Sequence, residues 1–129
     1  MTKEIYICII IVISVICAHF ACTNYTKNST FELENIFNEF KLELEKDDSN
    51  DEEINSKMKF IKEKWQDKYE KLAFYIEHDE LEKVETEIYG INANIDTGNY
   101  DEAIEKVEKC KFILKHIGNK ESLSFKNIF

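Results

Sequence analysis

The sequence predicts an all-α protein in which a single N-terminal transmembrane helix is followed by an up-and-down bundle of three to four helices. The chain of 129 residues has no Pro and only three Gly, whereas sheet proteins need turn residues at about every 8 to 12 positions. An uncharged apolar stretch occupies residues 5–22. Beyond it, apolar residues recur at three- and four-residue steps, the spacing of helices with one buried face.

Residues 5–22 form the predicted membrane segment. They hold no formal charge, and their clearly polar side chains are Ser14 and His19. A helix of this length spans about 27 Å, close to the hydrocarbon core of a bilayer at about 30 Å. Tyr6 and Tyr25 stand at its two ends, at the levels where amphipathic rings are favoured. We therefore expect the lipid bilayer to be a partner of this chain through residues 5–22.

Three interpretations of this segment remain open. An uncleaved signal anchor is favoured because the stretch exceeds the apolar region of a signal peptide, about 7 to 15 residues. A cleaved signal peptide would lack its basic start, since Glu4 offsets Lys3, and no Ala-x-Ala site follows. Lipidation at Cys22 has a suitable Ala21 before it, but His19 stands where a Leu is usual. The favoured interpretation predicts a single-pass protein of the cell membrane with its C-terminal domain outside the cytoplasm.

Two regions of the chain follow from this pattern. Residues 1–28 are the signal anchor and its tether, and residues 29–129 are an acidic helical bundle domain; the polar stretch 23–30 is expected to be non-helical. Acidic residues number 26 against 17 lysines, and there is no Arg. Because nucleic-acid binding depends on cations that neutralise phosphates, no nucleic acid is expected as a partner.

Amphipathic helices fill the second region. Ser29 or Thr30 is expected to cap the first, which runs to about Lys46. Ser49 and Glu52 form a capping box for the second. The apolar faces of these two helices comprise Leu33, Ile36, Phe37, Phe40 and Leu44, and then Ile54, Met58, Ile61, Trp65, Tyr69, Leu72 and Ile76.

A third helix is predicted after a tight turn near His78–Asp79, because the apolar rhythm changes phase there. Asp79 and Glu82 offer its cap, and Thr97–Gly98 its end. One long helix through this region is the alternative, since neither Gly nor Pro forces a break. The apolar face of the third helix comprises Leu81, Val84, Ile88, Ile91 and Ile95.

The fourth helix is expected to run from a cap at Asn99 and Glu102 to Gly118. Its apolar face comprises Ala103, Ile104, Val107, Cys110, Leu114 and Ile117. The remaining residues 119–129 are too apolar for a free tail. The tail residues expected to dock in the bundle are Leu123, Phe125, Ile128 and Phe129.

No motif identifies a reaction, so an enzyme is not expected, and neither a cofactor nor a metal is predicted. The acidic stretch 43–53 lacks the Gly and the final Glu of a calcium-binding loop, and no His and Glu residues have zinc or di-iron spacing. Helical spacing places the rings of Trp65, Phe60, Phe74 and Tyr75 in the core. Cys110 is expected to be a small buried hydrophobe.

Candidate interaction or sensing residues gather around the predicted turn. The run from Leu72 to Ile76 is apolar on all sides, so the C-terminal tail or a partner must cover it. Histidine is the side chain that most readily changes charge near neutral pH, and His78 stands among acidic residues. The candidates are Phe74, Tyr75, His78, Asp79 and Glu80.

Trp65, the run Ile76–Leu81 and the ending Ser122–Phe129 resemble the domain-of-unknown-function family 4363. Leu72 departs from the family's pattern, because a second Trp often stands at that position. The resemblance implies a small protein of anaerobic Gram-positive bacteria with an N-terminal hydrophobic anchor and a helical remainder. It assigns no activity and no catalytic residue, and it implies a multi-pass membrane protein as a companion.

These observations predict a membrane-anchored helical protein of the bacterial cell envelope that acts by contacting another protein. The alternative is a domain without catalytic activity that senses a proton, a cation or a small ligand through His78 and the carboxylates around it.

Overall fold

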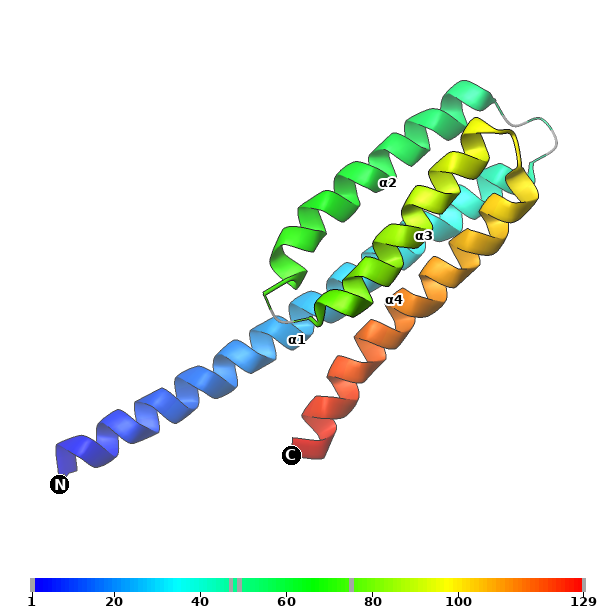
Figure 1. Ribbon diagram of the computed structural model, residues 1–129. Coiled ribbons are helices and arrows are strands. Elements are labelled where there is room, and N and C mark those ends of the chain that lie inside the picture. The colour runs from blue at the N-terminus through cyan, green and yellow to red at the C-terminus, as the bar shows by residue number, and fades with distance from the viewer. Residues whose placement is uncertain (1, 47, 49, 75, 129) are drawn as a thin grey trace.

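The structure is a computed structural model that describes residues 2–46, 48, 50–74 and 76–128, with side chains up to residue 120. Its described residues form four helices and no strand: α1 (Thr2–Glu45), α2 (Asp51–Leu72), α3 (His78–Asp96) and α4 (Tyr100–Ile128). The helices alternate in direction, and α4 packs against both α1 and α3 (Figure 1). The predicted all-α, up-and-down bundle is confirmed.

Helix α1 differs most from the prediction, because it carries the chain from the apolar segment into the bundle without a break (Figure 1). The predicted non-helical tether at 23–30 is wrong, and so is a helix cap at Ser29 or Thr30. Thr26 and Thr30 are buried, and their hydroxyls donate to the carbonyl oxygens of Cys22 and Lys27 at 2.9 and 3.1 Å. These polar side chains therefore have partners inside the helix itself.

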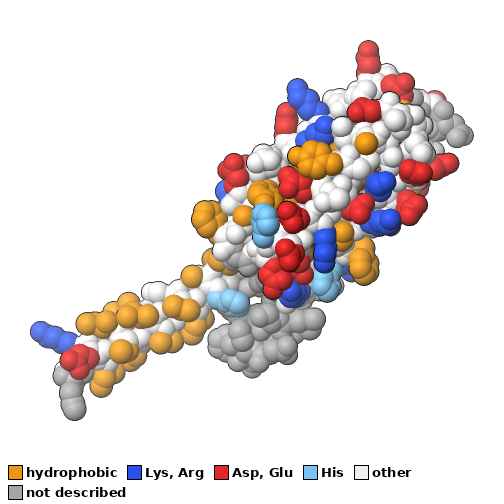
Figure 2. All heavy atoms as spheres, in the orientation of Figure 1, with side chains coloured by type: hydrophobic (Ala, Val, Ile, Leu, Met, Phe, Trp, Pro, Cys, Tyr) orange, Lys and Arg blue, Asp and Glu red, His pale blue; other side chains and the backbone are white. Residues whose placement is uncertain are grey.

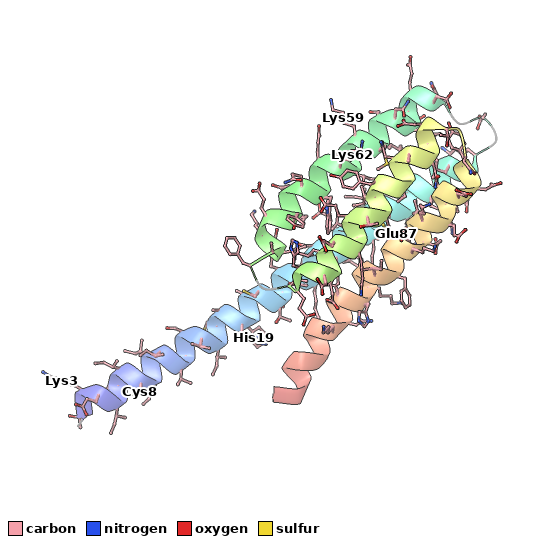
Figure 3. All side chains as sticks on the ribbon, viewed as in Figure 1. Lys3, Cys8, His19, Lys59, Lys62 and Glu87 are labelled. Carbon is pink, nitrogen blue, oxygen red and sulfur yellow. The ribbon has the colours of Figure 1, made fainter. Side chains whose placement is uncertain are left out.

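The first half of α1 stands apart from the bundle. By length and composition, α1 is the one helix among the described residues that is long and apolar enough to cross a membrane. Its most apolar window has a mean hydropathy of 2.7 and is 0% buried in the structure. Figure 2 shows this apolar rod projecting from a bundle that carries many acidic and lysine side chains on the face in view. Lys3 and Cys8 lie on the projecting part, and His19 lies where it approaches the bundle (Figure 3).

Helix α4 continues past its predicted end. Gly118 lies inside α4 and is buried, so the prediction that it terminates the helix is wrong. A Cβ at this position would lie 2.8 Å from Thr30 Oγ1, which shows that the missing side chain allows α1 to approach. The predicted docking of the tail side chains from Leu123 onward lies outside the described side chains.

The break between α2 and α3 is confirmed, and the alternative of one long helix is wrong. Helix α2 ends at Leu72, and Ile76 is buried in the turn, where its N–H donates to the Leu72 carbonyl oxygen at 2.8 Å. Asp79 is not the cap of α3 as predicted, because Glu77 precedes the first helical residue, His78. The turn therefore lies slightly earlier than the change of rhythm suggested.

The other helix ends follow the sequence closely. Asn50 caps α2, and its side-chain oxygen accepts from the Glu52 N–H at 2.9 Å; Ser49, the predicted capping residue, lies outside the described residues. Gly98 has a φ of 73° after α3, and its N–H donates to the Ile95 carbonyl oxygen at 3.1 Å. This left-handed position after a helix is the one that glycine favours.

The predicted stripes meet in one core. Trp65 is 3% exposed and Cys110 is 0% exposed, as predicted. The side chains of Ile36, Tyr69 and Ile104 lie partly exposed at its edge. The core residues of the four helices are Leu33, Phe37, Phe40, Leu44, Ile54, Met58, Ile61, Trp65, Leu72, Leu81, Val84, Ile88, Ile91, Ile95, Ala103, Val107, Cys110, Leu114 and Ile117.

Candidate interaction surfaces

The turn between α2 and α3 lies beside α1 at the point where the apolar segment enters the bundle. A hollow of about 270 Å³ at this junction is lined by Ala21, Cys22 and Tyr25 of α1 and by Lys71 and Phe74. Phe74 is 88% exposed, so the prediction that it belongs to the core is wrong. Its position in the turn, beyond the last residue of α2, takes it off the buried stripe. In the single chain this ring is therefore uncovered.

Tyr25 is surrounded by cations from α2. The Nζ atoms of Lys68 and Lys71 lie 5.7 and 5.8 Å from the centre of its ring, within the range of a cation–π interaction. Glu32 fixes Lys68, because its carboxylate lies 2.9 Å from Lys68 Nζ. This hydrogen bond lowers the pKa of Glu32 and raises that of Lys68. The junction of α1 and α2 thus combines aromatic rings with ammonium groups.

His78 lies at the start of α3 and is largely exposed. Its Nδ1 is 3.3 Å from the Tyr69 hydroxyl, and its Nε2 is 3.7 Å from Glu82 Oε1. Asp79 is exposed and lies beside Glu82 at the edge of another surface hollow. Tyr75 lies outside the described residues. The histidine therefore faces one carboxylate and one phenol rather than the whole acidic run.

Glu80 points toward α4 instead. Its side chain is 15% exposed, and its Oε1 lies 3.3 Å from Lys120 Nζ and 3.9 Å from His116 Nε2. Lys120 Nζ also lies 3.8 Å from Glu77 Oε1. The structure thus separates the predicted candidates: Phe74 lies beside α1, His78 beside α2 and Glu80 beside α4, while Asp79 lies at the edge of a hollow of its own. The pairing of Glu80 with His116 depends on the register of α3 against α4, which spacing along the chain did not reveal.

A further hollow, of about 330 Å³, lies between α1 and α2 and was not predicted. Phe60 at its edge is 47% exposed, which corrects its assignment to the core. Phe60 stands one residue before Ile61 and is therefore rotated by about 100° from the buried stripe, a signal that the sequence already contained. The residues lining this hollow are Ile36, Glu39, Phe40, Ser56, Lys57, Phe60 and Ile61.

Comparison with models of protein families gives a match over most of the chain. The family model described as "Domain of unknown function (DUF4363)" matches residues 20–128, which include all of the bundle. No curated protein and no solved structure matches the chain. The match confirms the resemblance carried by Trp65, the run Ile76–Leu81 and the C-terminal residues, and this chain belongs to the DUF4363 family.

Proposed function

We propose that this chain is a single-pass membrane protein whose bundle lies outside the cytoplasm and binds another protein of the cell envelope. The apolar half of α1 supports the anchoring, because it is long enough to cross a bilayer and no other part of the described chain covers it. The hollow between α1 and α2 supports the binding role. It is the single observation that favours a protein partner over a purely structural anchor.

The α1–α2 hollow has the arrangement of a protein-binding pocket. Phe40 and Ile61, each 1% exposed, form a rigid floor that belongs to the core. Phe60 supplies an accessible aromatic edge, and Glu39 and Lys57 supply a rim with both signs of charge. Binding energy at protein interfaces concentrates in such desolvated pockets surrounded by polar residues. A large apolar side chain of the partner would fill the hollow while its backbone meets the rim.

Photo-crosslinking in intact cells tests the binding role. A photoreactive phenylalanine is placed at Phe60 in the full chain, with the same residue at Phe112 as the matched control. Phe112 is 73% exposed on α4 but does not line this hollow. We expect an adduct with a second protein from position 60 and not from position 112. Equal adducts from both positions, or none from position 60, would contradict this role.

The anchoring is tested separately in the same cells. The unmodified chain should stay with membranes through alkaline extraction, and its mass should still include residues 1–22. External protease should cut the connection between α1 and α2 before the cells are lysed. A mature chain that begins after Cys22 without lipid, or one released by alkali, would contradict the anchoring.

Proton sensing is a second candidate function, favoured by two histidine–glutamate pairs at the same end of the bundle. His78 faces Glu82, and His116 faces Glu80. Protonation of each ring would place a positive charge next to a carboxylate. The unfolding temperature is measured at neutral and at mildly acidic pH in the parent and in a variant with both histidines changed to Gln, and a sensing role requires that the two chains respond differently. An identical change in parent and variant would eliminate this candidate.

A further inference from the structure

We infer that the α2–α3 turn contacts the membrane surface, with Phe74 inserted at the headgroup level of the bilayer that α1 crosses. The inference rests on the proposed anchoring and adds a second, independent point of contact with lipid. It names the bilayer itself as the occupant of the hollow formed by Phe74, Lys71 and the adjacent part of α1.

The depth of Phe74 follows from its neighbours on α1. Ala21 and Cys22 are the last residues of the apolar segment, and they line the same hollow as Phe74. Tyr25, the other α1 residue of the hollow, lies about 4.5 Å beyond Cys22 along the helix axis. The polar layer on each side of a bilayer is about 5 to 7 Å thick. A chain anchored through residues 5–22 therefore holds Phe74 within the headgroup layer.

The chemistry of the hollow fits that depth. Phe74 presents an 88% exposed ring, which is costly in water and favourable at the boundary between headgroups and acyl chains. Lys71 extends its ammonium group over the Tyr25 ring, so its stem lies on an apolar surface while its charge can reach lipid phosphate. Tyrosine is itself enriched at this level of membranes. The hollow thus places aromatic rings and a lysine at the headgroup level, where these side chains are favoured.

The charges around the turn indicate which force holds it there. Glu77 and Glu80 face Lys120, and Glu82 faces His78. On the other side of the turn, Glu32 is paired with Lys68. Asp79 and Glu70 are exposed, so no excess of positive charge adjoins Lys71. Insertion of the ring therefore provides the attraction, and vesicles of neutral phosphatidylcholine should suffice.

Fluorescence quenching by brominated lipids measures this contact. The full chain carrying Phe74→Trp is reconstituted into phosphatidylcholine vesicles, and the spectrum of the parent, which contains only the buried Trp65, is subtracted. The matched control is Phe112→Trp. Position 112 adjoins Lys111, which contacts Asn38, about 24 Å beyond Cys22 along α1. Both sites are exposed, so the substitutions leave the core intact.

We expect lipids brominated near the glycerol end of the acyl chain to reduce the emission of the Phe74→Trp variant by about half and to leave that of the Phe112→Trp variant unchanged. Lipids brominated near the methyl end should quench the Phe74→Trp variant less. Flotation with the vesicles is measured on the same samples. A Phe74→Trp chain that floats while its introduced indole stays unquenched overturns the inference alone and leaves the ring for a protein partner. A chain that does not float overturns the anchoring and the inference together.

Discussion

Gly118 on α4 lies so close to Thr30 on α1 that a Cβ on the glycine would stand 2.8 Å from the threonine Oγ1. Thr30 is buried, and its hydroxyl donates to the Lys27 carbonyl oxygen at 3.1 Å. A short β-branched side chain in a helix has few other positions to adopt. The contact thus sets how closely α1 and α4 approach where the bundle meets the apolar segment.

Gly118→Ala is expected to reduce the free energy of unfolding by about 1 kcal/mol. Overpacking costs about 1 to 3 kcal/mol, and the better helix propensity of Ala returns about 1 kcal/mol. In a Thr30→Ala background the same change should stabilise the protein, because the clashing oxygen is absent. Chemical unfolding of all four chains in detergent gives the coupling. An equal effect of Gly118→Ala in both backgrounds would show that the contact does not limit the approach.

Gly90→Ala should have the opposite sign, although its added Cβ would also meet an atom at 2.8 Å. That atom is Lys106 Cε, with Cδ at 2.9 Å, and both belong to a long side chain that can move aside. We expect a gain of about 0.5 to 1 kcal/mol from helix propensity. The same unfolding assay measures it, and a loss of stability would mean that the Lys106 side chain is held in place.

Substitutions at Gly98 measure the energetic cost of its backbone conformation without any side-chain clash. Its φ is 73°, and nothing lies within 4 Å of an added Cβ. Gly98→Ala should therefore cost about 1 to 2 kcal/mol, and Gly98→Leu should cost the same because there is nothing to clash with. Gly98→Asn should cost less, since Asn tolerates this conformation. A cost that grows with the size of the side chain would disprove this explanation.

The ion pairs of the Glu43 carboxylate should make the stability of the protein depend on pH. Its side chain is 4% exposed, and Oε2 lies 3.0 Å from Lys46 Nζ and 3.8 Å from Lys57 Nζ. The hydrogen bond from Lys46 holds the pKa of Glu43 below its ordinary value of 4.5. The stabilisation is therefore complete above about pH 4.5 and is lost as the pH falls through the lowered pKa. Glu43→Gln should lower the unfolding temperature at neutral pH and have less effect in acid.

The matched control for Glu43 is Glu45→Gln. Glu45 is 47% exposed and lies 3.7 Å from Lys41 Nζ, the kind of surface pair that contributes little. Its substitution should change the unfolding temperature less at every pH. If the two variants behave alike, the burial of Glu43 has no energetic significance.

Cys110 should resist alkylation in the folded protein. The side chain is 0% exposed, and burial raises the pKa of its thiol to about 12, so almost no reactive thiolate exists at neutral pH. Mass spectrometry of peptides after iodoacetamide treatment should find residue 110 modified only when denaturant is present. Modification in the folded protein at the rate of a free thiol would show that α3 and α4 separate readily.

The periodic parts of the fold were predictable because the apolar residues of each buried face recur at three- and four-residue steps within a single helix. Leu81, Val84 and Ile88 show the pattern well, since one stripe determines both the helix and its buried face. The break before α3 was predictable from the change of phase. These features depend on local spacing, which the sequence contains directly.

The errors at Thr26, Thr30 and Gly118 share a physical cause, which is dependence on residues far along the chain. Thr26 and Thr30 suggest a tether when considered locally, yet they are buried within α1. Gly118 suggests a helix end, yet it lies inside α4, where the absence of a side chain allows α1 to approach closely. Neither role can be recognised until α1 and α4 are side by side. The candidate site shows the same dependence. Glu80 and His116 approach each other only across two helices, and Phe74 shares a hollow with Cys22 and Tyr25 only in the folded chain.

The unbroken course of α1 has a mechanical consequence. Glu45 stands about 35 Å beyond Cys22 on one stiff rod, so a change of about 10° in the tilt of the apolar segment would displace the far end of the bundle by roughly 6 Å. Rotation of the segment about its own axis would likewise turn the α1–α2 hollow toward a different neighbour. Bilayer thickness and lateral contacts within the membrane would thereby set the direction in which the acidic domain faces.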